Sequence, residues 1–168
     1  MKVAILCDSH FGARNDNSFF LEYMLQFYEG GFFPYLQQHN IKTVIHLGDL
    51  MDRRKYVSIK TAKEFRERFM LPISHLKLDF HCLVGNHDIF FKNTNDVNSL
   101  RELIDGRSDK IKIYEDPTDV NIGGLDILFL PWITPQNQIY TEGMIDSTNA
   151  SIAMGHLEIK GFQMNKGI

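Results

Sequence analysis

The sequence predicts a layered α/β domain, and three observations support this prediction. Short strand-like runs recur along the chain with helical segments between them, in the order β-α-β-α-β-α-β-β-α-β. Runs such as residues 3–7 are apolar throughout and do not alternate, which is typical of strands buried on both faces in sheets covered by helices. The length of 168 residues suits one domain with its own hydrophobic core.

Six short strands are predicted. They cover residues 2–8, 43–48, 80–85, 111–115, 126–130 and 151–154. Gly123 and Gly124 separate two extended runs, so we expect a hairpin within residues 119–130.

Three segments have the apolar spacing of surface helices. They cover residues 17–38, 58–71 and 96–105, and the Gly30-Gly31 pair is expected to split the first of them into two pieces. An Asn or Asp begins the third segment, and Gly106 follows its end. The residues expected to face inward are Phe20, Met24 and Phe27 in the first, Ala62, Phe65 and Phe69 in the second, and Val97, Leu100 and Ile104 in the third.

Composition excludes several classes of protein. Hydrophobic residues make up 43% and charged residues 23% of the chain, which argues against disorder, collagen and coiled coil. The longest apolar run, residues 3–7, is far shorter than the roughly 18 residues of a membrane span. No secretory signal precedes it. We therefore expect a cytoplasmic protein without a membrane partner.

Charge and cysteine content add two expectations. The 18 basic and 21 acidic side chains give a net charge of −3, so charge alone does not favour non-specific binding to nucleic acid. A polyanionic substrate would need a local basic patch or metal ions. Cys7 and Cys82 each lie inside an apolar run, which suits buried free thiols in a reducing compartment.

Polar residues follow four of the predicted strands. Since the carboxyl ends of parallel strands meet at one edge of a sheet, residues far apart in the sequence should form one site there. Each group offers oxygen or imidazole ligands. The groups are Asp8-Ser9-His10, Gly48-Asp49-Leu50-Met51-Asp52-Arg53, Gly85-Asn86-His87-Asp88 and Gly155-His156.

The ligand types favour two divalent cations. Carboxylate, amide and imidazole groups without a thiolate suit Mn²⁺, with Mg²⁺, Fe²⁺ or Zn²⁺ as possible alternatives. Two cations about 3.5–4 Å apart need a bridging carboxylate, and together they can activate a water for in-line attack at phosphorus. Asp49 is the natural bridge. Glycine before Asp49, Asn86 and His156 suits tight turns into a crowded site.

These four blocks, in this order, resemble the calcineurin-like metallophosphoesterase superfamily. Within it, the sequence is most similar to the SbcD-type nuclease subunits of double-strand-break repair complexes and their phage counterparts. The narrower resemblance rests on three further stretches: Asp52-Arg53-Arg54-Lys55, Leu130-Pro131-Trp132 and residues 155–161. The resemblance covers the whole chain and implies a sandwich of mixed β-sheets flanked by helices. A phage-encoded member would act in the cytoplasm of its host.

The resemblance also implies a role for each metal ligand. Asp8 and His10 would hold the first cation, and Asp49 would bridge it to the second. Asn86 and His156 would complete part of the second cation's shell.

Two further residues are implied to act in catalysis. His87 would contact the scissile phosphate and protonate the leaving oxygen. Asp52 would orient His87 and favour its protonated form, because a nearby carboxylate raises the pKa of an imidazole. Some nucleases of the superfamily have histidine at the position of Asp52, whereas its protein phosphatases keep aspartate.

One part of the family pattern does not occur between residues 1 and 168. The resemblance predicts a further Gly-His-x-His block after Gly155-His156, with one histidine for each cation. We therefore expect residues 1–168 to be a nuclease domain that is incomplete at its carboxy-terminal end. The intact protein would continue into a smaller segment that caps DNA and binds a partner.

Basic residues near the predicted site suggest contacts with DNA phosphates. Arg53, Arg54 and Lys55 follow the bridging aspartate, and Arg14 follows the first site loop. Such side chains could position a phosphate backbone without reading its sequence. The alternative is an ordinary solvated loop.

Four other residues have two interpretations each. Asp88 either holds its own loop through backbone hydrogen bonds or takes part in catalysis. His46 is a core histidine or a support for the metal ligands. Phe11 and Trp132 could stack on nucleic acid or pack in the core.

The predicted function is a Mn²⁺-dependent DNA nuclease, both an exonuclease and a single-strand endonuclease, in recombination and double-strand-break processing. The resemblance implies a homodimer with an SbcC-type coiled-coil ATPase partner, and residues 17–38 could form part of a dimer face or only of the core. Two alternatives stay open. One is a metal-dependent phosphatase or nucleotide phosphodiesterase, and the other is a catalytically silent dimerisation module.

Overall fold

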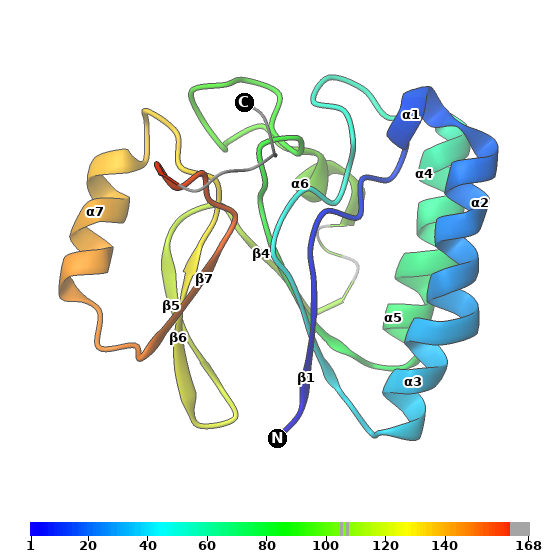
Figure 1. Cartoon of the computed structure of the whole chain (residues 1–168), viewed down its shortest axis with the longest axis horizontal. Coiled ribbons are helices and arrows are strands. Elements are labelled where there is room, and N and C mark those ends of the chain that lie inside the picture. The colour runs from blue at the N-terminus through cyan, green and yellow to red at the C-terminus, as the bar shows by residue number, and fades with distance from the viewer. Residues whose placement is uncertain (105, 107, 162–168) are drawn as a thin grey trace.

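Two β-sheets packed face to face, with helices on their outer sides, form the protein (Figure 1). This arrangement is taken from a computed structural model, which describes residues 1–104, 106 and 108–161. The larger sheet is entirely parallel, in the order β1-β2-β3-β4. Its strands are β1 (Val3–Leu6), β2 (Thr43–His46), β3 (Asp79–Leu83) and β4 (Ile111–Tyr114). The predicted layered α/β fold is confirmed.

The smaller sheet is mixed. It contains β5 (Thr118–Ile122), β6 (Leu125–Leu130) and β7 (Ile152–Gly155). β5 and β6 are antiparallel, whereas β6 and β7 are parallel. The predicted hairpin joins β5 to β6, and its two linking residues, Gly123 and Gly124, have φ of 61° and 89°. Two positive φ values in sequence are what a tight two-residue hairpin needs, and glycine adopts them at little cost.

Helices cover the outer face of each sheet. In Figure 1, α2 to α5 lie along the larger sheet and α7 lies beside the smaller one. Two five-residue π-helical turns, Tyr28–Phe32 and Arg66–Met70, interrupt the α-helical pattern. The α-helices are α1 (Ala13–Asp16), α2 (Ser18–Phe27), α3 (Phe33–Gln38), α4 (Ile59–Phe65), α5 (Leu71–His75), α6 (Ser99–Ile104) and α7 (Gln138–Ser147). Within the described part of the chain, none of them is long and apolar enough to cross a membrane.

The glycine pair lies where the first helical segment divides into α2 and α3, as expected, but the helical path is not broken there. Instead, the chain stays helical through a π turn in which the Phe33 amide bonds the carbonyl of Tyr28. Pro34 follows immediately. The second helical segment does the same, with a π turn directly before Leu71 and Pro72. Proline cannot donate a hydrogen bond and its ring crowds the carbonyl four residues earlier, so a wider turn before it keeps the helix continuous.

The buried face of α2 also differs from the prediction. Leu21, Leu25 and Tyr28 point into the core, whereas Phe20 and Phe27 are 43% and 55% exposed. Met24 packs against the core as expected, but Phe20 and Phe27 do not, so the predicted stripe is wrong by about one residue around the helix. Apolar side chains surround most of this helix, so hydrophobic spacing alone does not identify the side that packs on the sheet.

The other two predicted helical faces are largely confirmed. Phe65 and Phe69 are buried, as are Leu100 and Ile104. Val97 is instead exposed, because α6 begins two residues later, after Asn98, whose side chain accepts the Arg101 amide and caps the helix. Residue 105, the predicted last residue of this helix, lies outside the described residues.

Two hydrophobic cores hold the layers together. The larger lies between the helices and the parallel sheet and includes Phe65, Phe69 and Phe80. The second lies between the two sheets and includes Ile45 and Phe129.

The second core hardly reaches β1. Val3 packs against it, but Ile5 is 49% exposed, so the prediction that this strand is buried on both faces is wrong. β1 is an edge strand of the larger sheet, which leaves part of one face open. Cys7, just after β1, is accordingly exposed, whereas Cys82 in β3 is buried as expected.

A buried polar pair lies in the core between the sheets. His81 Nδ1 is 2.7 Å from the hydroxyl of Tyr114 on the neighbouring strand. Burial lowers the pKa of His81 from 6.5 to about 4 and raises that of Tyr114 from 10 to about 12. His81 is therefore a neutral packing residue.

We predict that His81 makes the fold acid-sensitive. Below pH 6.5 the unfolded chain binds a proton at His81 and the folded chain does not, so stability falls as the pH decreases toward 4. By this linkage the His81 contribution between pH 7.5 and pH 5 is about 2 kcal/mol. His81→Gln can still bond Tyr114 but cannot titrate, so its unfolding free energy should depend less on pH by that amount. Urea denaturation at both pH values measures it; the exposed His39→Gln is the control and should follow wild type.

Candidate metal centre

The polar groups predicted to form one site do meet at one edge of the molecule. The parallel strands β1, β2 and β3 end at the same edge of the larger sheet, and β7 of the smaller sheet ends beside them (Figure 1). Loops after these four strands carry the predicted site residues. They are Asp8 and His10 after β1, Asp49 and Asp52 after β2, Asn86 and His87 after β3, and His156 after β7.

The first two loops run side by side because the pairing of β1 with β2 continues beyond the strands. The amides of Asp8, His10 and Phe11 donate to the carbonyls of Gly48, Asp49 and Leu50 at 3.1, 3.0 and 2.9 Å. This pairing holds the loop of Asp8 and His10 against the loop of Asp49.

Three of the predicted ligands have left-handed backbone conformations. The φ angles are 54° at Asp8, 47° at His10 and 54° at Asp49. Such conformations are uncommon outside glycine, although aspartate and histidine tolerate them better than most residues. Strained backbone persists only where its surroundings enforce it, and it is concentrated at functional sites.

The first trio of donors is Asp8, His10 and Asp49. His10 Nε2 lies 3.5 Å from Asp8 Oδ1 and 3.7 Å from Asp49 Oδ2. Donors bound to one ion at about 2.0–2.2 Å lie roughly 3–3.5 Å from one another. His10 Nε2 is therefore close to the spacing of shared ligands with each of these two carboxylates.

The second trio is Asp49, Asn86 and His156. His156 Nε2 lies 2.8 Å from Asn86 Oδ1 and 3.4 Å from Asp49 Oδ2. The other ring nitrogen donates to the carbonyl of Leu47 at 3.1 Å, which leaves Nε2 as the nitrogen that can bind a metal. Asp49 Oδ2 is thus within 4 Å of both His10 and His156, the position that a bridging carboxylate needs.

The Asp49 carboxylate stays charged although it is only 3% exposed. Burial by itself would raise the pKa of Asp49, but the interaction with His156 and the amide of His87, 2.7 Å away, bring that pKa below its ordinary value. Burial would likewise lower the pKa of His156, but the facing Asp49 carboxylate raises it to about 10. A buried negative charge of this kind attracts a cation.

Asp52 contacts His87 differently from the expectation. His87 Nδ1 donates to the main-chain carbonyl of Asp52 at 2.6 Å, not to its carboxylate. The carboxylate instead lies 3.4 Å from Nδ1 of His10. The expected carboxylate–imidazole pair between Asp52 and His87 is therefore not present. The loop turns the Asp52 side chain toward the first ligand loop, where it can orient a metal-binding imidazole.

Of the two interpretations of Asp88, the structure supports the one in which its carboxylate holds its loop through backbone hydrogen bonds. Its carboxylate is fully buried and accepts the amides of Met51 and Gly85, both at 2.9 Å, and of Leu50 at 3.4 Å. Burial raises its pKa to about 6. Asp88 thus joins the second and third site loops and is not available to a substrate.

The four basic residues differ in their surroundings. Arg53 is used inside the protein, since it contacts Asp16 at 3.2 Å and the hydroxyl of Tyr56 at 2.7 Å. Arg14 lies against the ring of Phe20 at 5.6 Å. Arg54 and Lys55 remain as candidates for contacts with a substrate.

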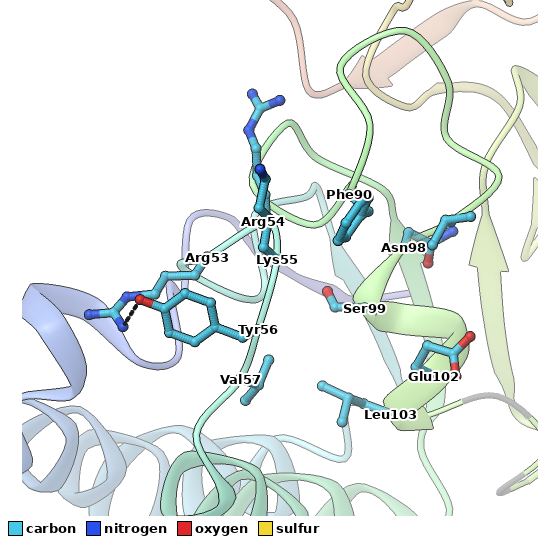
Figure 2. A pocket seen from close by; sticks show the side chains of 11 residues that line it. Arg53, Arg54, Lys55, Tyr56, Val57, Phe90, Asn98, Ser99, Glu102 and Leu103 are labelled. Carbon is cyan, nitrogen blue, oxygen red and sulfur yellow. Dashed lines mark hydrogen bonds between the residues drawn. The ribbon is translucent and has the colours of Figure 1, made fainter.

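Figure 2 shows a pocket of about 290 Å³ behind the second site loop. The loop of Arg53, Arg54 and Lys55 forms one side, and α6 forms the opposite side. The guanidinium of Arg54 points away from the pocket in this view. Lys55 Nζ lies 5.9 Å from the ring of Phe90. Among the described residues, no ion pair joins Arg54 or Lys55 to an acidic group.

The core interpretation holds for Phe11, and Trp132 is partly buried beside the site. Phe11 is buried against Phe65 and Phe69. The ring of Trp132 packs against the larger core and lies 6.0 Å from the ring of His156.

One side chain near the centre was not predicted. The donor atoms of Cys7, Asp8 and His156 lie within 4.8 Å of one another, as do those of His10, Asp49 and His87. The side chain that was not predicted is Cys7. Its place in an apolar run suggested a buried thiol, but Cys7 directly precedes the predicted ligand Asp8. That position in the sequence was the signal that it lies beside the site.

We predict that Gly85→Ala disrupts the centre. A Cβ at Gly85 would lie 2.2 Å from the amide nitrogen of Asp49 and 2.3 Å from its Oδ1, so the bridging residue would have to move. We expect a loss of about 1–3 kcal/mol in stability, as for other overpacked sites, together with weaker Mn²⁺ binding. Denaturation and calorimetric titration measure both. Gly143→Ala on α7 has open space around its Cβ and should change neither adversely; an unchanged Gly85→Ala variant would contradict the prediction.

The whole chain is similar to known proteins. The family model of the calcineurin-like phosphoesterases matches residues 1–166. Exonuclease subunit 1 of Enterobacteria phage T4 is 30% identical over 168 residues, which are 100% of this chain and 49% of the relative. The chain thus spans about half the length of this curated relative.

Two solved structures are similar at lower identity. A protein of unknown function from Aquifex aeolicus has a TM-score of 0.45 and 20% identity, over 95% of this chain and 80% of that one. The nuclease MPE of Pseudomonas putida has a TM-score of 0.43 and 18% identity, over 74% of this chain and 51% of that one. The match of the family model over nearly the whole chain is decisive: the chain belongs to the calcineurin-like phosphoesterase family.

Proposed function

We propose that this chain is the catalytic part of a DNA nuclease that uses two divalent cations, with Mn²⁺ preferred. The observation that carries the proposal is the position of the Asp49 carboxylate between His10 and His156, at 3.7 and 3.4 Å. Membership in a phosphoesterase family supplies the reaction class. The similarity to a phage exonuclease subunit supports DNA as the substrate.

The donor set fits such cations. Carboxylate, amide and imidazole groups suit Mn²⁺, and Mg²⁺, Fe²⁺ or Zn²⁺ are alternatives. Asp8 and His10 would hold one cation, Asn86 and His156 the other, and Asp49 both. When bound, the cations would supply Lewis acidity to the phosphate and to an attacking water.

His87 is the proposed general acid. Its Nδ1 donates to the carbonyl of Asp52, which keeps a proton on that nitrogen. Nε2 is then the ring nitrogen that can carry a second proton and transfer it to the departing oxygen of the phosphodiester. The amide of His87 also bonds Asp49, so the loop that holds the bridging carboxylate also positions the acid.

Arg54 and Lys55 are proposed to contact the DNA backbone. The chain carries a net charge of −3, so attraction of a polyanion depends on local cations and bound metals. Arg53, by contrast, is proposed to hold the loop in place through Asp16 and Tyr56.

We further propose that the intact protein is a homodimer, partnered by an SbcC-type coiled-coil ATPase, and that it works in DNA recombination and break repair in the cytoplasm. Residues 17–38 are proposed to contribute both to the core and to the dimer face. Leu21 and Leu25 pack into the core, while Phe19, Tyr23 and Phe27 form an exposed aromatic stripe four residues apart along α2. Such a stripe is a surface that a second copy could cover.

A metal-dependent phosphatase is the second candidate, because Asp52 matches the aspartate kept by protein phosphatases of the superfamily. Assays of DNA cleavage, phosphomonoester cleavage and metal binding separate the candidates. Cleavage of a phosphomonoester without cleavage of DNA would favour the phosphatase, and a protein that binds no metal would favour a silent dimerisation module.

We predict that His87→Ala slows DNA cleavage strongly while metal binding persists. Loss of a general acid lowers rates by about 10²- to 10⁴-fold. The assay is Mn²⁺-dependent digestion of linear and single-stranded DNA by the intact protein, with Mn²⁺ affinity measured in parallel. The exposed His39→Ala serves as the control and should cut like wild type. Undiminished cutting by His87→Ala would contradict the proposed role.

We also predict a salt-dependent defect for the double variant Arg54→Ala, Lys55→Ala. Each lost phosphate contact lowers the slope of log K against log salt by about 0.7 for single strands and 0.9 for duplex DNA. Binding is measured with a non-cleavable DNA at several salt concentrations. Lys63→Ala, whose side chain on α4 is exposed and near Glu67, is the matched control and should leave the slope unchanged. Equal slopes for the double variant and wild type would remove these residues from the DNA surface.

A further inference from the structure

A buried polar network lies directly behind the proposed metal centre. Ser9 Oγ is 2.7 Å from the hydroxyl of Tyr28 and 2.7 Å from Nε2 of His46. All three residues are buried, and His46 is completely so. None of the three is a proposed metal ligand.

The direction of the hydrogen bonds follows from one main-chain donor. The amide of Gly48 donates to His46 Nδ1 at 3.3 Å, so Nδ1 must be the acceptor nitrogen of the ring. Burial lowers the pKa of His46 to about 3, which keeps the imidazole neutral. Nε2 therefore carries the ring's proton and donates a hydrogen bond to Ser9 Oγ.

The network joins the three segments on which the centre depends. Ser9 lies between the ligands Asp8 and His10, and Gly48 directly precedes Asp49. Tyr28 is the first residue of the π turn in the helix that covers the sheet. One chain of hydrogen bonds thus ties both ligand loops to the helical layer.

Both loops need such support. Asp8, His10 and Asp49 all have positive φ, which is unfavourable at each residue unless the surroundings enforce it. A buried hydrogen bond that loses one partner leaves the other unsatisfied, which makes this network costly to break.

The hydroxyl of Tyr28 has a function beyond packing. Its ring packs among the rings of Phe11, Phe33 and Phe69, where phenylalanine would pack equally well. Among the described residues, the hydroxyl forms one hydrogen bond, to Ser9.

We propose that Tyr28, Ser9 and His46 are positioning residues that set the cation affinity of the centre by holding both ligand loops in their strained conformations. This inference rests on the proposed two-cation function. The residues do not touch a cation or the substrate. They act through the backbone of Asp8, His10 and Asp49.

The test compares two buried tyrosine hydroxyls. Tyr28→Phe removes the anchor of the network, and Ser9→Ala removes its centre. Tyr114→Phe is the matched control, because its hydroxyl is also 2.7 Å from a buried histidine but lies in the core between the sheets. Each variant of the intact protein is titrated with Mn²⁺ by calorimetry, and its melting temperature is measured without metal.

We expect Tyr28→Phe and Ser9→Ala to bind Mn²⁺ about 10- to 100-fold more weakly, the range found when groups that orient metal ligands are removed. Tyr114→Phe should bind like wild type even though its melting temperature falls as far as that of Tyr28→Phe. In the nuclease assay, half-saturation should move to higher Mn²⁺, with the full rate recovered at saturation.

Three outcomes separate the possibilities. Weaker Mn²⁺ binding by the network variants alone supports the inference. Wild-type affinity in Tyr28→Phe and Ser9→Ala, or an equal loss in Tyr114→Phe, overturns it and leaves the metal centre standing. Absence of Mn²⁺ binding by wild type overturns the proposed function and the inference together.

Discussion

The close approach of Asp49 to Gly85 is the constraint on which the rest of the site depends. With no Cβ at Gly85, the loops after β2 and β3 can touch, and the buried carboxylate of Asp49 reaches the amide of His87. The same carboxylate then lies between the imidazoles of His10 and His156. A larger residue at Gly85 would push these groups apart, so the donor set exists only because two parallel strands end side by side with glycine at one of them.

Strain in the ligand loops is balanced by buried hydrogen bonds. The positive φ angles of Asp8, His10 and Asp49 are costly for the isolated chain. Three sets of hydrogen bonds beside the site offset this cost. They are the continued pairing of β1 with β2, the three amides bound by Asp88, and the Tyr28–Ser9–His46 network. The donors are therefore arranged before a cation binds, and less ordering remains to oppose binding.

The charges near the site divide into two groups with different partners. The acidic and imidazole groups face one another at the strand ends, where a cation would relieve the cost of a buried carboxylate. Arg53 is neutralised by Asp16, whereas no acidic group among the described residues pairs with Arg54 or Lys55 on the same loop. Adjacent basic residues thus have different surroundings, because within the described part of the chain only Arg53 turns toward an acidic group.

Local pattern in the sequence determined much of this protein: the alternating strands and helices, the hairpin at Gly123-Gly124, and the polar blocks that end four strands. Only tertiary structure decided which face of α2 packs, how each long helix passes its proline, and that the Asp52 carboxylate turns to His10. It also decided that Ser9, Tyr28 and His46 meet. The physical reason is range, since hydrophobic spacing and turn chemistry act over a few residues. Contacts such as that of His156 with Leu47, 109 residues apart, exist only after the layers have packed.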